Sequence, residues 1–407
     1  MIADGCHVFA GGFSFGVMKE MTVPRQLEVH GLGRDTAKSA GLDFIEAGHW
    51  EDWPDPTPKA CMLFGNPRCT GFSCVTGGHG EETHGAWSKP TVDIHQLCHY
   101  GVHHGYPIIC WESVQQAMST GRPLLDYLRD KLFVPNGYRI AHLLLNAASF
   151  GNSQHRKRYF FFAYKADKNF NIVPPVLPER HKTVGDVLLT EDLLNREVES
   201  SRFGKKDEYH ADCYMKRCAD EEALIPYLPH HVDLNMLARY DYEKLESLSA
   251  KYAMTWRYRN SDMPFSMHSI IRLDPDGPCP VISSSAGRFI HPTLDRPLTM
   301  RELALLMGWP SHITPLGYHP IGQIGKGICP EVGTWLAQQA KNYVNDIWGK
   351  EDWESSYDEL KGEWVGRDYT SDEFGPPEKT FDLTTYSPAK PIIREREERI
   401  ADVRFAK

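Results

Sequence analysis

Four side chains with reactive or charged groups stand next to apolar runs of this chain. They are Cys69, Glu112, Arg156 and Arg158. Cys69 lies between Pro67 and Gly71 and follows an apolar run, as expected where a buried strand passes into a tight loop. A thiol in such a loop is either a packing residue, because free cysteine is often buried, or a nucleophile. With a carboxyl group and two guanidinium groups similarly placed, the pattern favours a site built around a cysteine nucleophile.

The elements that must position these side chains alternate between strand-like and helix-like stretches over the first 165 residues. The expected strands are His7–Ala10, Ala60–Phe64, Tyr106–Cys110, Ala141–Asn146 and Tyr159–Tyr164. Strands separated by helices predict an α/β fold with a mostly parallel sheet. Such sheets bind ligands beyond the carboxyl ends of their strands, which is where Gly11, Cys69 and Glu112 fall.

The length and composition of the chain limit the class of protein. A chain of 407 residues can bury a sizeable core, and we expect one larger and one smaller domain. The sequence contains no run of 18 or more apolar residues and begins without a basic and apolar leader. We therefore expect an intracellular, cytoplasmic protein with no membrane partner. Its ten cysteines form no CxxC pair, which indicates reduced thiols rather than a disulfide framework or a zinc ribbon.

The net charge of -9 is unusual for a protein that binds nucleic acid, but it is unevenly distributed. Residues 351–407 hold 15 acidic against 9 basic residues, which accounts for six of these nine charges. The remaining chain is close to neutral, and contact with phosphates requires a basic surface only where the nucleic acid lies.

Five motifs follow one another in an order that resembles the DNA cytosine-5 methyltransferases. The nucleophile loop of that family reads GxPCQGFS, and the later motifs are an ENV glutamate, a QxRxR arginine pair, RxLTxRE with QGFP, and GNAVPP. The matching segments here are residues 65–75, 111–114, 154–158, 296–310 and 324–330. Any one of these matches would be weak, whereas five in order are specific.

The resemblance implies a fold and a division of the chain. We expect a Rossmann-like class I methyltransferase sheet with a smaller inserted target-recognition domain. Residues 1–165 and 291–348 would form the catalytic domain, residues 166–290 the target-recognition region, and residues 349–407 a charged extension. Aromatic and arginine residues at 252–260 suit either DNA contact or the core of a small domain. Double-stranded DNA is the implied partner, and we expect a monomer from a bacterial cell or a phage-infected host.

The resemblance also implies the roles of the four side chains. The Cys69 thiolate would add to C6 of a flipped cytosine, so that C5 can attack a one-carbon electrophile. Glu112 would act as a general acid at N3, Arg158 would bind the cytosine O2, and Arg156 would brace the cysteine loop. The alternatives are a structural thiol, a surface carboxylate and solvated basic residues.

Further residues are assigned by position in the motifs. Gln154 and Ser73 are expected to contact DNA, and residues 76–86 to form a lid over the flipped base. His95, His99 and His103 recur every fourth residue and would share one face of a helix. We interpret this as a polar helix face rather than a metal site, because zinc prefers a more compact set with cysteine or carboxylate partners.

The cofactor half of the motifs departs from the family pattern. The residues expected to bind S-adenosyl-L-methionine (AdoMet) are Phe9, Ala10, Gly11, Gly12, Glu28 and Pro67. The first motif, FAGxGG, is shortened here, and the aspartate expected near the adenine aligns with His49. In the final motif the asparagine is Lys326 and the first proline is Cys329.

Three functions are compatible with these departures. The first is AdoMet-dependent methylation by a divergent enzyme. The second is transfer from 5,10-methylenetetrahydrofolate to give hydroxymethylcytosine, and the third is DNA binding by an inactive relative.

Overall fold

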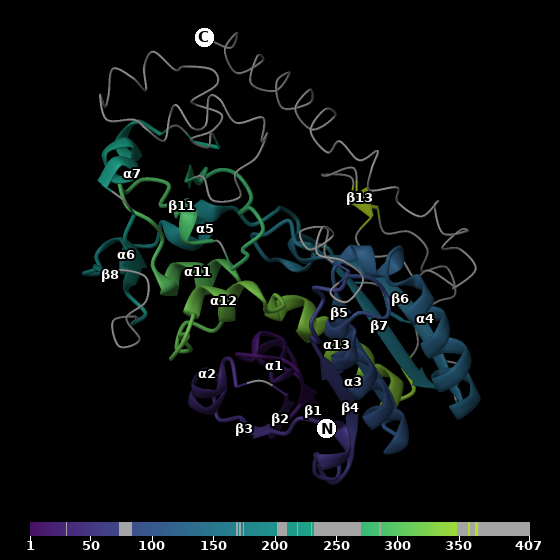
Figure 1. The fold of residues 1–407 in the computed structure, drawn as a ribbon. Coiled ribbons are helices and arrows are strands. Elements are labelled where there is room, and N and C mark those ends of the chain that lie inside the picture. The colour runs from purple at the N-terminus through teal and green to yellow at the C-terminus, as the bar shows by residue number, and fades with distance from the viewer. Residues whose placement is uncertain are drawn as a thin grey trace, which may run out of the picture. The chain divides into compact units, whose positions relative to one another are not determined.

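The chain forms two compact units. The computed structural model describes residues 1–29, 31–72, 84–167, 170, 172–173, 175–201, 210–217, 219–228, 230–231, 270–284, 286–347, 357–358 and 363–364. Unit 1 comprises Met1–Lys216, Asp274–Gly287 and Pro297–Gly375, and unit 2 comprises Arg217–Leu273, Arg288–Arg296 and Pro376–Lys407. Figure 1 shows the elements of each unit.

A seven-stranded sheet is the framework of unit 1, with the strand order β3-β2-β1-β4-β5-β7-β6. The strands are β1 (Ile2–Cys6), β2 (Arg25–Glu28), β3 (Asp43–Glu46), β4 (Ala60–Gly65), β5 (Ile108–Ser113), β6 (Tyr138–Asn146) and β7 (Lys157–Lys165). The first five run parallel, and β7 is antiparallel to both β5 and β6. The expected Rossmann-like α/β class is confirmed.

Helices and short strand pairs complete unit 1. The helices are α1 (Gly12–Val17), α2 (Arg34–Ser39), α3 (Val92–His103), α4 (Arg122–Tyr127), α5 (Val184–Leu188), α6 (Glu191–Leu194), α11 (Met300–Leu306), α12 (Pro320–Gly325), α13 (Pro330–Val344) and a π-helix at Leu128–Phe133. Short 3-10 helices lie at Trp50–Asp52, Lys89–Thr91, Gln115–Met118, Val134–Asn136 and Ala147–Phe150. The pairs are β8 (Glu199–Ser201) with β9 (Cys213–Met215), and β12 (Tyr357–Asp358) with β13 (Glu363–Trp364).

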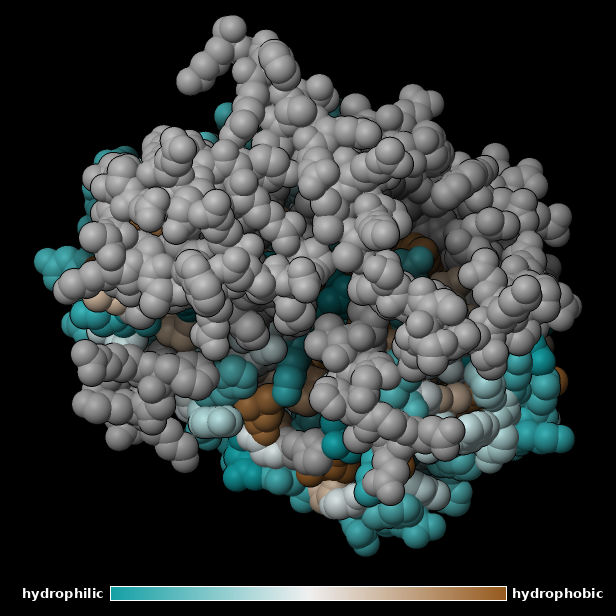
Figure 2. All heavy atoms as spheres, turned by 45° about the horizontal axis from the view of Figure 1, so that its top comes forward, coloured by the Kyte–Doolittle hydropathy of each residue, from teal (hydrophilic) through white to brown (hydrophobic). Residues whose placement is uncertain are grey.

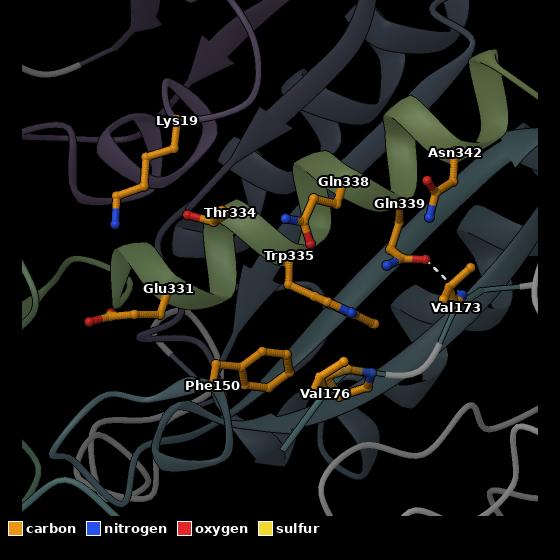
Figure 3. Close-up of a pocket in the computed structure, with 11 residues that line it drawn as sticks. Lys19, Phe150, Val173, Val176, Glu331, Thr334, Trp335, Gln338, Gln339 and Asn342 are labelled. Atoms are coloured by element: carbon orange, nitrogen blue, oxygen red, sulfur yellow. Dashed lines mark hydrogen bonds between the residues drawn. The ribbon is translucent and has the colours of Figure 1, made fainter. Parts of the chain in front are cut away.

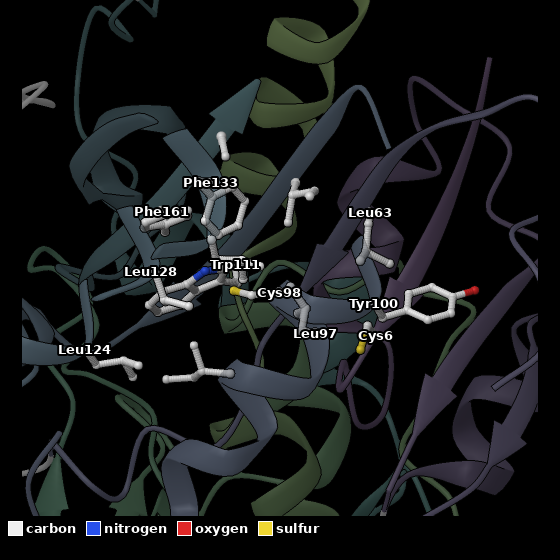
Figure 4. Close-up of a cluster of buried hydrophobic side chains, with 14 of the residues drawn as sticks. Cys6, Leu63, Leu97, Cys98, Tyr100, Trp111, Leu124, Leu128, Phe133 and Phe161 are labelled. Atoms are coloured by element: carbon white, nitrogen blue, oxygen red, sulfur yellow. The ribbon is translucent and has the colours of Figure 1, made fainter. Parts of the chain in front are cut away.

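The two faces of the sheet follow from the alternation of side chains along each strand. Trp111 of β5 and Phe161 of β7 stack with ring centroids 5.2 Å apart, in the hydrophobic cluster that α3 and α4 cover (Figure 4). On the other face, Phe13 of α1 contacts Phe64 of β4 and Phe160 of β7. Both faces of the sheet are therefore buried, which explains why its central strands read as continuous apolar runs.

The first strand differs from the prediction. Residues His7–Ala10 were expected to form it, but β1 spans Ile2–Cys6 and residues 7–10 form the turn into α1. His7 and Phe9 have φ angles of 55° and 58°, which a regular strand does not contain. The other four expected runs overlap β4, β5, β6 and β7.

Polar Asp4 obscured β1 in the sequence, and its contacts explain how it is tolerated in a buried strand. Arg25 donates two hydrogen bonds to its carboxylate, at 3.1 and 3.2 Å, and Thr57 and the Tyr106 hydroxyl donate others. Burial alone would raise the pKa of Asp4, but these hydrogen bonds together hold it below its ordinary value.

Replacing Asp4 by alanine should lower the free energy of unfolding by about 3–5 kcal/mol, because the Arg25 guanidinium would remain buried without its partner. Urea denaturation measures the change, and Asp43→Ala at the exposed start of β3 is the control. The folded-state pKa is lowered, so this stabilisation is present above the unfolded pKa of about 3.9 and is lost as the pH falls through the folded value. Equal stability of the two variants at neutral pH would contradict this assignment.

The described part of unit 2 contains α7 (Ala219–Leu224), a 3-10 helix at Ile225–Tyr227, and the parallel pair β10 (Ile271–Arg272) and β11 (Phe289–Ile290). Buried Arg272 connects these pieces. Its guanidinium donates to the carbonyls of Leu228, Ile225 and His291 and forms an ion pair with Asp295.

Within the described ranges, no helix is long and apolar enough to cross a membrane. The surface in Figure 2 is mainly hydrophilic where residues are described, with smaller apolar areas. The eight cysteines in the described part of the chain are free thiols.

Candidate active site

The loops that carry the expected site residues leave neighbouring strands at the same edge of the sheet. Cys6 at the end of β1 is paired with Gly65 at the end of β4, and Gly65 is paired with Trp111 of β5. The carboxyl ends of three parallel strands therefore lie side by side. This brings together the turn after β1, the cysteine loop after β4 and Glu112.

The cysteine loop is tightly folded around Cys69. The Cys69 carbonyl accepts a hydrogen bond from the Phe72 amide, and the Gly85 amide donates to the Gly71 carbonyl. A Cβ atom on Gly71 would lie 2.4 Å from the Ser88 hydroxyl oxygen, so a larger residue at position 71 would require the Ser88 side chain to move. Cys69 itself is partly buried.

Glu112 and Arg158 form the centre of the site. Glu112 is 3% exposed, and its carboxylate oxygen Oε1 lies 3.0 Å from Arg158 Nε. Glu112 is paired directly with Phe160 across β5 and β7, and Arg158 precedes Phe160 by two residues. All three side chains consequently lie on the face of the sheet that α1 covers.

Arg156 is a buried clamp beside this pair. Its guanidinium donates to the carbonyls of Ile282, Gly325 and Gly327 at 2.8–3.0 Å. Burial, with Arg158 adding to it, lowers the pKa of Arg156 to about 10, so the group remains charged at neutral pH. Arg156 thus secures the turn at residues 325–327, which in turn is bound to the cysteine loop through Asn66.

The charged groups of the site have opposing effects on the pKa of Cys69. Burial raises the pKa of Cys69, and the Glu112 carboxylate raises it further, whereas Arg158 and Arg156 lower it. Burial also raises the pKa of Glu112 and outweighs the two arginines. A carboxyl group that keeps its proton to higher pH suits proton donation, and the arginines favour the thiolate.

The turn after β1 carries the expected cofactor residues. Gly11 has a φ of 104°, and a Cβ on Gly12 would lie 3.0 Å from the Ile328 carbonyl oxygen. Buried Glu28, at the end of β2, accepts hydrogen bonds from the Val8 and Phe9 amides at 2.6 and 3.0 Å. The carboxylate of Glu28 therefore shapes the turn.

Ala10 and Pro67 are buried in the two loops, one after β1 and one after β4. His49, which aligns with the family aspartate, accepts a hydrogen bond from the Glu51 amide at 3.4 Å.

Gln154 and Ser73 were expected to contact DNA, and the structure describes only the first of them. Gln154 is fully buried. Its side-chain Nε2 donates a hydrogen bond to the Leu306 carbonyl, and its Oε1 accepts one from the Ile282 amide. These contacts join the segment before β7 to α11 and to residues 279–282, so the side chain faces protein rather than solvent. Ser73 lies outside the described residues, as do residues 76–83 of the expected lid and residues 252–260.

Two residues of the cysteine loop, Asn66 and Arg68, had no assigned role. Asn66 Nδ2 donates to the Lys326 carbonyl at 2.6 Å, and Arg68 binds Asp93 of α3 with two hydrogen bonds at 2.6 and 2.9 Å. These interactions connect the cysteine loop to two distant segments. The GNPRC sequence contains Asn66 and Arg68, but the sequence does not reveal their partners.

The histidines of α3 share one helix face, as the spacing predicted. The rings of His95 and His99 stack with centroids 6.3 Å apart, and Trp50 contacts His99 and His103. Among the residues that the structure describes, no three or more histidine, cysteine or acidic side chains are placed to hold a metal ion.

A pocket of about 560 Å³ lies on the outer face of α13 (Figure 3). Trp335 and Phe150 form its aromatic wall, with ring centroids 5.4 Å apart, and Lys19 and Glu331 lie at one end. Cys69 and Glu112 are not among its lining residues. This pocket is therefore distinct from the thiol site.

Together, the sheet order and the thiol, carboxyl and guanidinium groups at its carboxyl edge define a Rossmann-like α/β protein with a candidate site at that edge. Residues 124–342, more than half of the chain, match the family described as C-5 cytosine-specific DNA methylase. The chain belongs to this family, and it is a DNA (cytosine-5)-methyltransferase-like enzyme.

The individual relatives have low sequence identity to this chain. Type II methyltransferase M.DdeI of Desulfomicrobium norvegicum is 22% identical over 317 residues, which are 70% of this chain and 73% of the relative. Type II methylase M.HgiDII of Herpetosiphon aurantiacus is 25% identical over 223 residues, covering 52% of this chain and 58% of the relative. A solved structure assigned as a DNA modification methyltransferase of an E. coli prophage has a TM-score of 0.58 at 19% identity, with 85% of this chain and 99% of that chain covered. That likeness supports the fold.

Proposed function

We propose that this protein methylates C5 of cytosine in double-stranded DNA, with AdoMet as the methyl donor. The observation that carries the proposal is the convergence of Cys69, Glu112, Arg158 and Arg156 at one edge of the sheet in a member of this family.

Cys69 is the nucleophile in this mechanism. Its thiolate adds to C6 of the cytosine, which makes C5 electron-rich enough to attack a methyl group. The ring atoms are inaccessible within a duplex, so the base must flip out of the helix to reach the thiol. After transfer, loss of the C5 proton and release of the sulfur from C6 regenerate Cys69.

Glu112 and Arg158 act on the opposite edge of the ring. Glu112 donates a proton or hydrogen bond to N3, which lowers the energy of the adduct as charge develops on the ring. Arg158 binds the O2 atom and is held in place by Glu112. Arg156 orients the surrounding turns through three backbone carbonyls.

The turn after β1 and the loop after β4 fit a cofactor at the same edge. Positive φ at Gly11 and the close approach at Gly12 leave no room for larger side chains, as in turns that approach a ligand. Phe9, Ala10 and Pro67 would flank the group, and Glu28 would order the amides of the turn. AdoMet supplies an electrophilic methyl group when bound.

The region 166–290, which contains α7, β10 and β11, is assigned to target recognition. It is inserted between the two parts of the chain that carry the catalytic motifs. Ser73 and the loop that follows it are assigned to contact with the DNA around the flipped base.

Nucleoside mass spectrometry tests this function directly. Duplex DNA is incubated with the purified protein and either AdoMet or methylenetetrahydrofolate, and the modified nucleosides are quantified. We expect 5-methylcytosine with AdoMet and no product with the folate. Hydroxymethylcytosine formed only with the folate would overturn the donor. Absence of any product, together with no covalent adduct on DNA containing 5-fluorocytosine, would overturn the enzymatic function.

A further inference from the structure

Arg68 stands directly before Cys69, at a place where the family motif has a proline. The motif reads GxPCQGFS, whereas residues 65–69 of this chain read GNPRC, so that Pro67 is one residue further from the cysteine. A proline fixes its own φ angle at about −65°, and an arginine leaves that angle free. The backbone immediately before the candidate nucleophile therefore lacks the covalent restraint that the motif provides.

The Arg68 side chain is held by Asp93 of α3 in a two-point fork. Its Nε donates to Oδ2 of Asp93 at 2.6 Å, and its Nη2 donates to Oδ1 at 2.9 Å. Asp93 is 2% exposed and lies in the first turn of this 12-residue helix, so its carboxylate is a firmly placed acceptor. Two parallel hydrogen bonds fix the orientation of the guanidinium plane as well as its distance. The fork thus restricts the residue that precedes Cys69.

Arg68 lies between two other anchors of the cysteine loop. On one side, Asn66 Nδ2 donates to the Lys326 carbonyl at 2.6 Å. On the other side, the Phe72 side chain is buried in the core, and the Phe72 amide donates to the Cys69 carbonyl at 3.0 Å. The fork adds a connection to α3 at the position next to the thiol.

Burial makes this ion pair different from one on the surface. An exposed pair contributes little, because water competes for both groups. The Asp93 carboxylate is buried, and removal of Arg68 would leave its charge without this partner. Arg68 itself is partly exposed, so contact with a DNA phosphate is the alternative role of this residue. However, the two donors that bind Asp93 are directed into the protein.

We propose that Arg68 is a positioning residue, whose fork with Asp93 holds the backbone before Cys69 and thereby fixes the direction of the thiol. The fork supplies the restraint that a proline supplies in the family motif. The inference rests on the proposed function for its purpose, because it assumes that Cys69 is the nucleophile.

Amide hydrogen exchange of the peptide that contains residues 66–72 measures this restraint without DNA or donor. Arg68→Met and Asp93→Asn should each accelerate exchange in this peptide roughly three- to tenfold, because the loop opens more often without the fork. The double variant should exchange no faster than the faster single variant, since both substitutions remove the same interaction.

Single-turnover methyl transfer from AdoMet to duplex DNA measures the consequence for the reaction. Arg68→Met and Asp93→Asn should each lower the rate at saturating DNA roughly 10- to 100-fold, because a small displacement of a reacting group is costly. Arg68→Lys should be slow as well, since an ammonium keeps the charge but cannot form the fork. The Kd for DNA should stay within about twofold of wild type in all three variants.

A phosphate contact gives a different set of results. Arg68→Met would then weaken DNA binding and reduce its dependence on salt, Arg68→Lys would keep most of the binding, and Asp93→Asn would leave the rate unchanged. This outcome would overturn the proposal.

Arg129→Met is the matched control, because it removes an arginine–aspartate fork of the same geometry outside the site. Arg129 Nε and Nη2 donate to the Asp130 carboxylate at 2.6 and 2.9 Å in the π-helix. We expect wild-type exchange in residues 66–72 and a wild-type rate. Thermal unfolding is recorded for each variant. If Arg68→Met unfolds, the double variant replaces it, because that variant no longer buries an unpaired charge at position 93. Wild-type exchange in either protein would overturn the proposal.

The exchange and methylation results are separable. Faster exchange in Arg68→Met and Asp93→Asn, in a protein that transfers no methyl group, would support the restraint and contradict the proposed function. Methyl transfer by the wild type, with exchange and rates unchanged in both variants, would do the reverse.

Discussion

Replacing Cys69 by serine should reduce methyl transfer by roughly four orders of magnitude or more, because loss of a covalent nucleophile removes the step on which the rest of the mechanism depends. A hydroxyl retains its proton far above neutral pH and cannot add to C6. The measurement is single-turnover transfer of labelled methyl groups from AdoMet to duplex DNA.

Cys61→Ser is the matched control for this variant. Cys61 is a partly buried thiol of β4, and its sulfur contacts the Ile2 carbonyl at the opposite end of the strand from the site. Activity within a few-fold of wild type is expected. If Cys69→Ser retained the same activity, Cys69 would not be the nucleophile.

Covalent trapping adds a second readout for Cys69. DNA containing 5-fluorocytosine should form a stable adduct with the wild-type protein and with Cys61→Ser, but not with Cys69→Ser. An adduct that persisted without Cys69 would assign the addition to another thiol.

Replacing Glu112 by glutamine should reduce methyl transfer by roughly 10²–10⁴-fold, the usual contribution of a positioned general acid. Glutamine keeps the shape of the side chain but has no acidic proton. It also leaves the Arg158 guanidinium without its carboxylate at 3.0 Å, so this arginine should bind the cytosine less precisely.

The pH dependence of the methyl-transfer rate tests whether Glu112 acts in its protonated form. Burial raises the pKa of this carboxyl, so the protonated, active form should persist to higher pH than for an ordinary glutamate. The wild-type rate should therefore fall as the pH rises through this value, and Glu112→Gln should lose that limb of the profile. An unchanged profile in the variant would exclude Glu112 as the acid.

Glu331→Gln is the matched control, because Glu331 is a buried carboxyl group that lies outside the site. Burial raises the pKa of Glu331 too, but this residue lies in the first turn of α13 and accepts a hydrogen bond from Asn152. We expect its activity to remain within a few-fold of wild type. A large loss in both variants would indicate damage to the fold rather than loss of the acid.

The chemical groups of the site and the class of the fold could be predicted from the amino-acid sequence. Cys69 and Glu112 follow apolar runs, and the period-two alternation of a strand places Arg156 and Arg158 on one side. These are local properties of the chain. Parallel strands separated by helices also bring their carboxyl ends to one edge, so the meeting of the loops followed from the pattern alone.

The contacts between these groups depend on the tertiary structure. The Glu112–Arg158 ion pair and the clamp between Arg156 and residues 325–327 join segments far apart in the chain, and no sequence periodicity encodes their geometry. The same holds for β1, whose Asp4 appears unsuitable for a buried strand until Arg25, Thr57 and Tyr106 surround it.

Gln154 and Lys326 are two further residues whose surroundings the motifs did not predict. The motif suggested that Gln154 contacts DNA, whereas packing buries its amide among backbone groups. Lys326 appeared only as a departure from the family motif, whereas the fold places its ammonium group 5.6 Å from the centroid of the Phe9 ring. Burial and electrostatics depend on neighbours in space, and for this reason the surroundings of these two residues could not be predicted from the sequence.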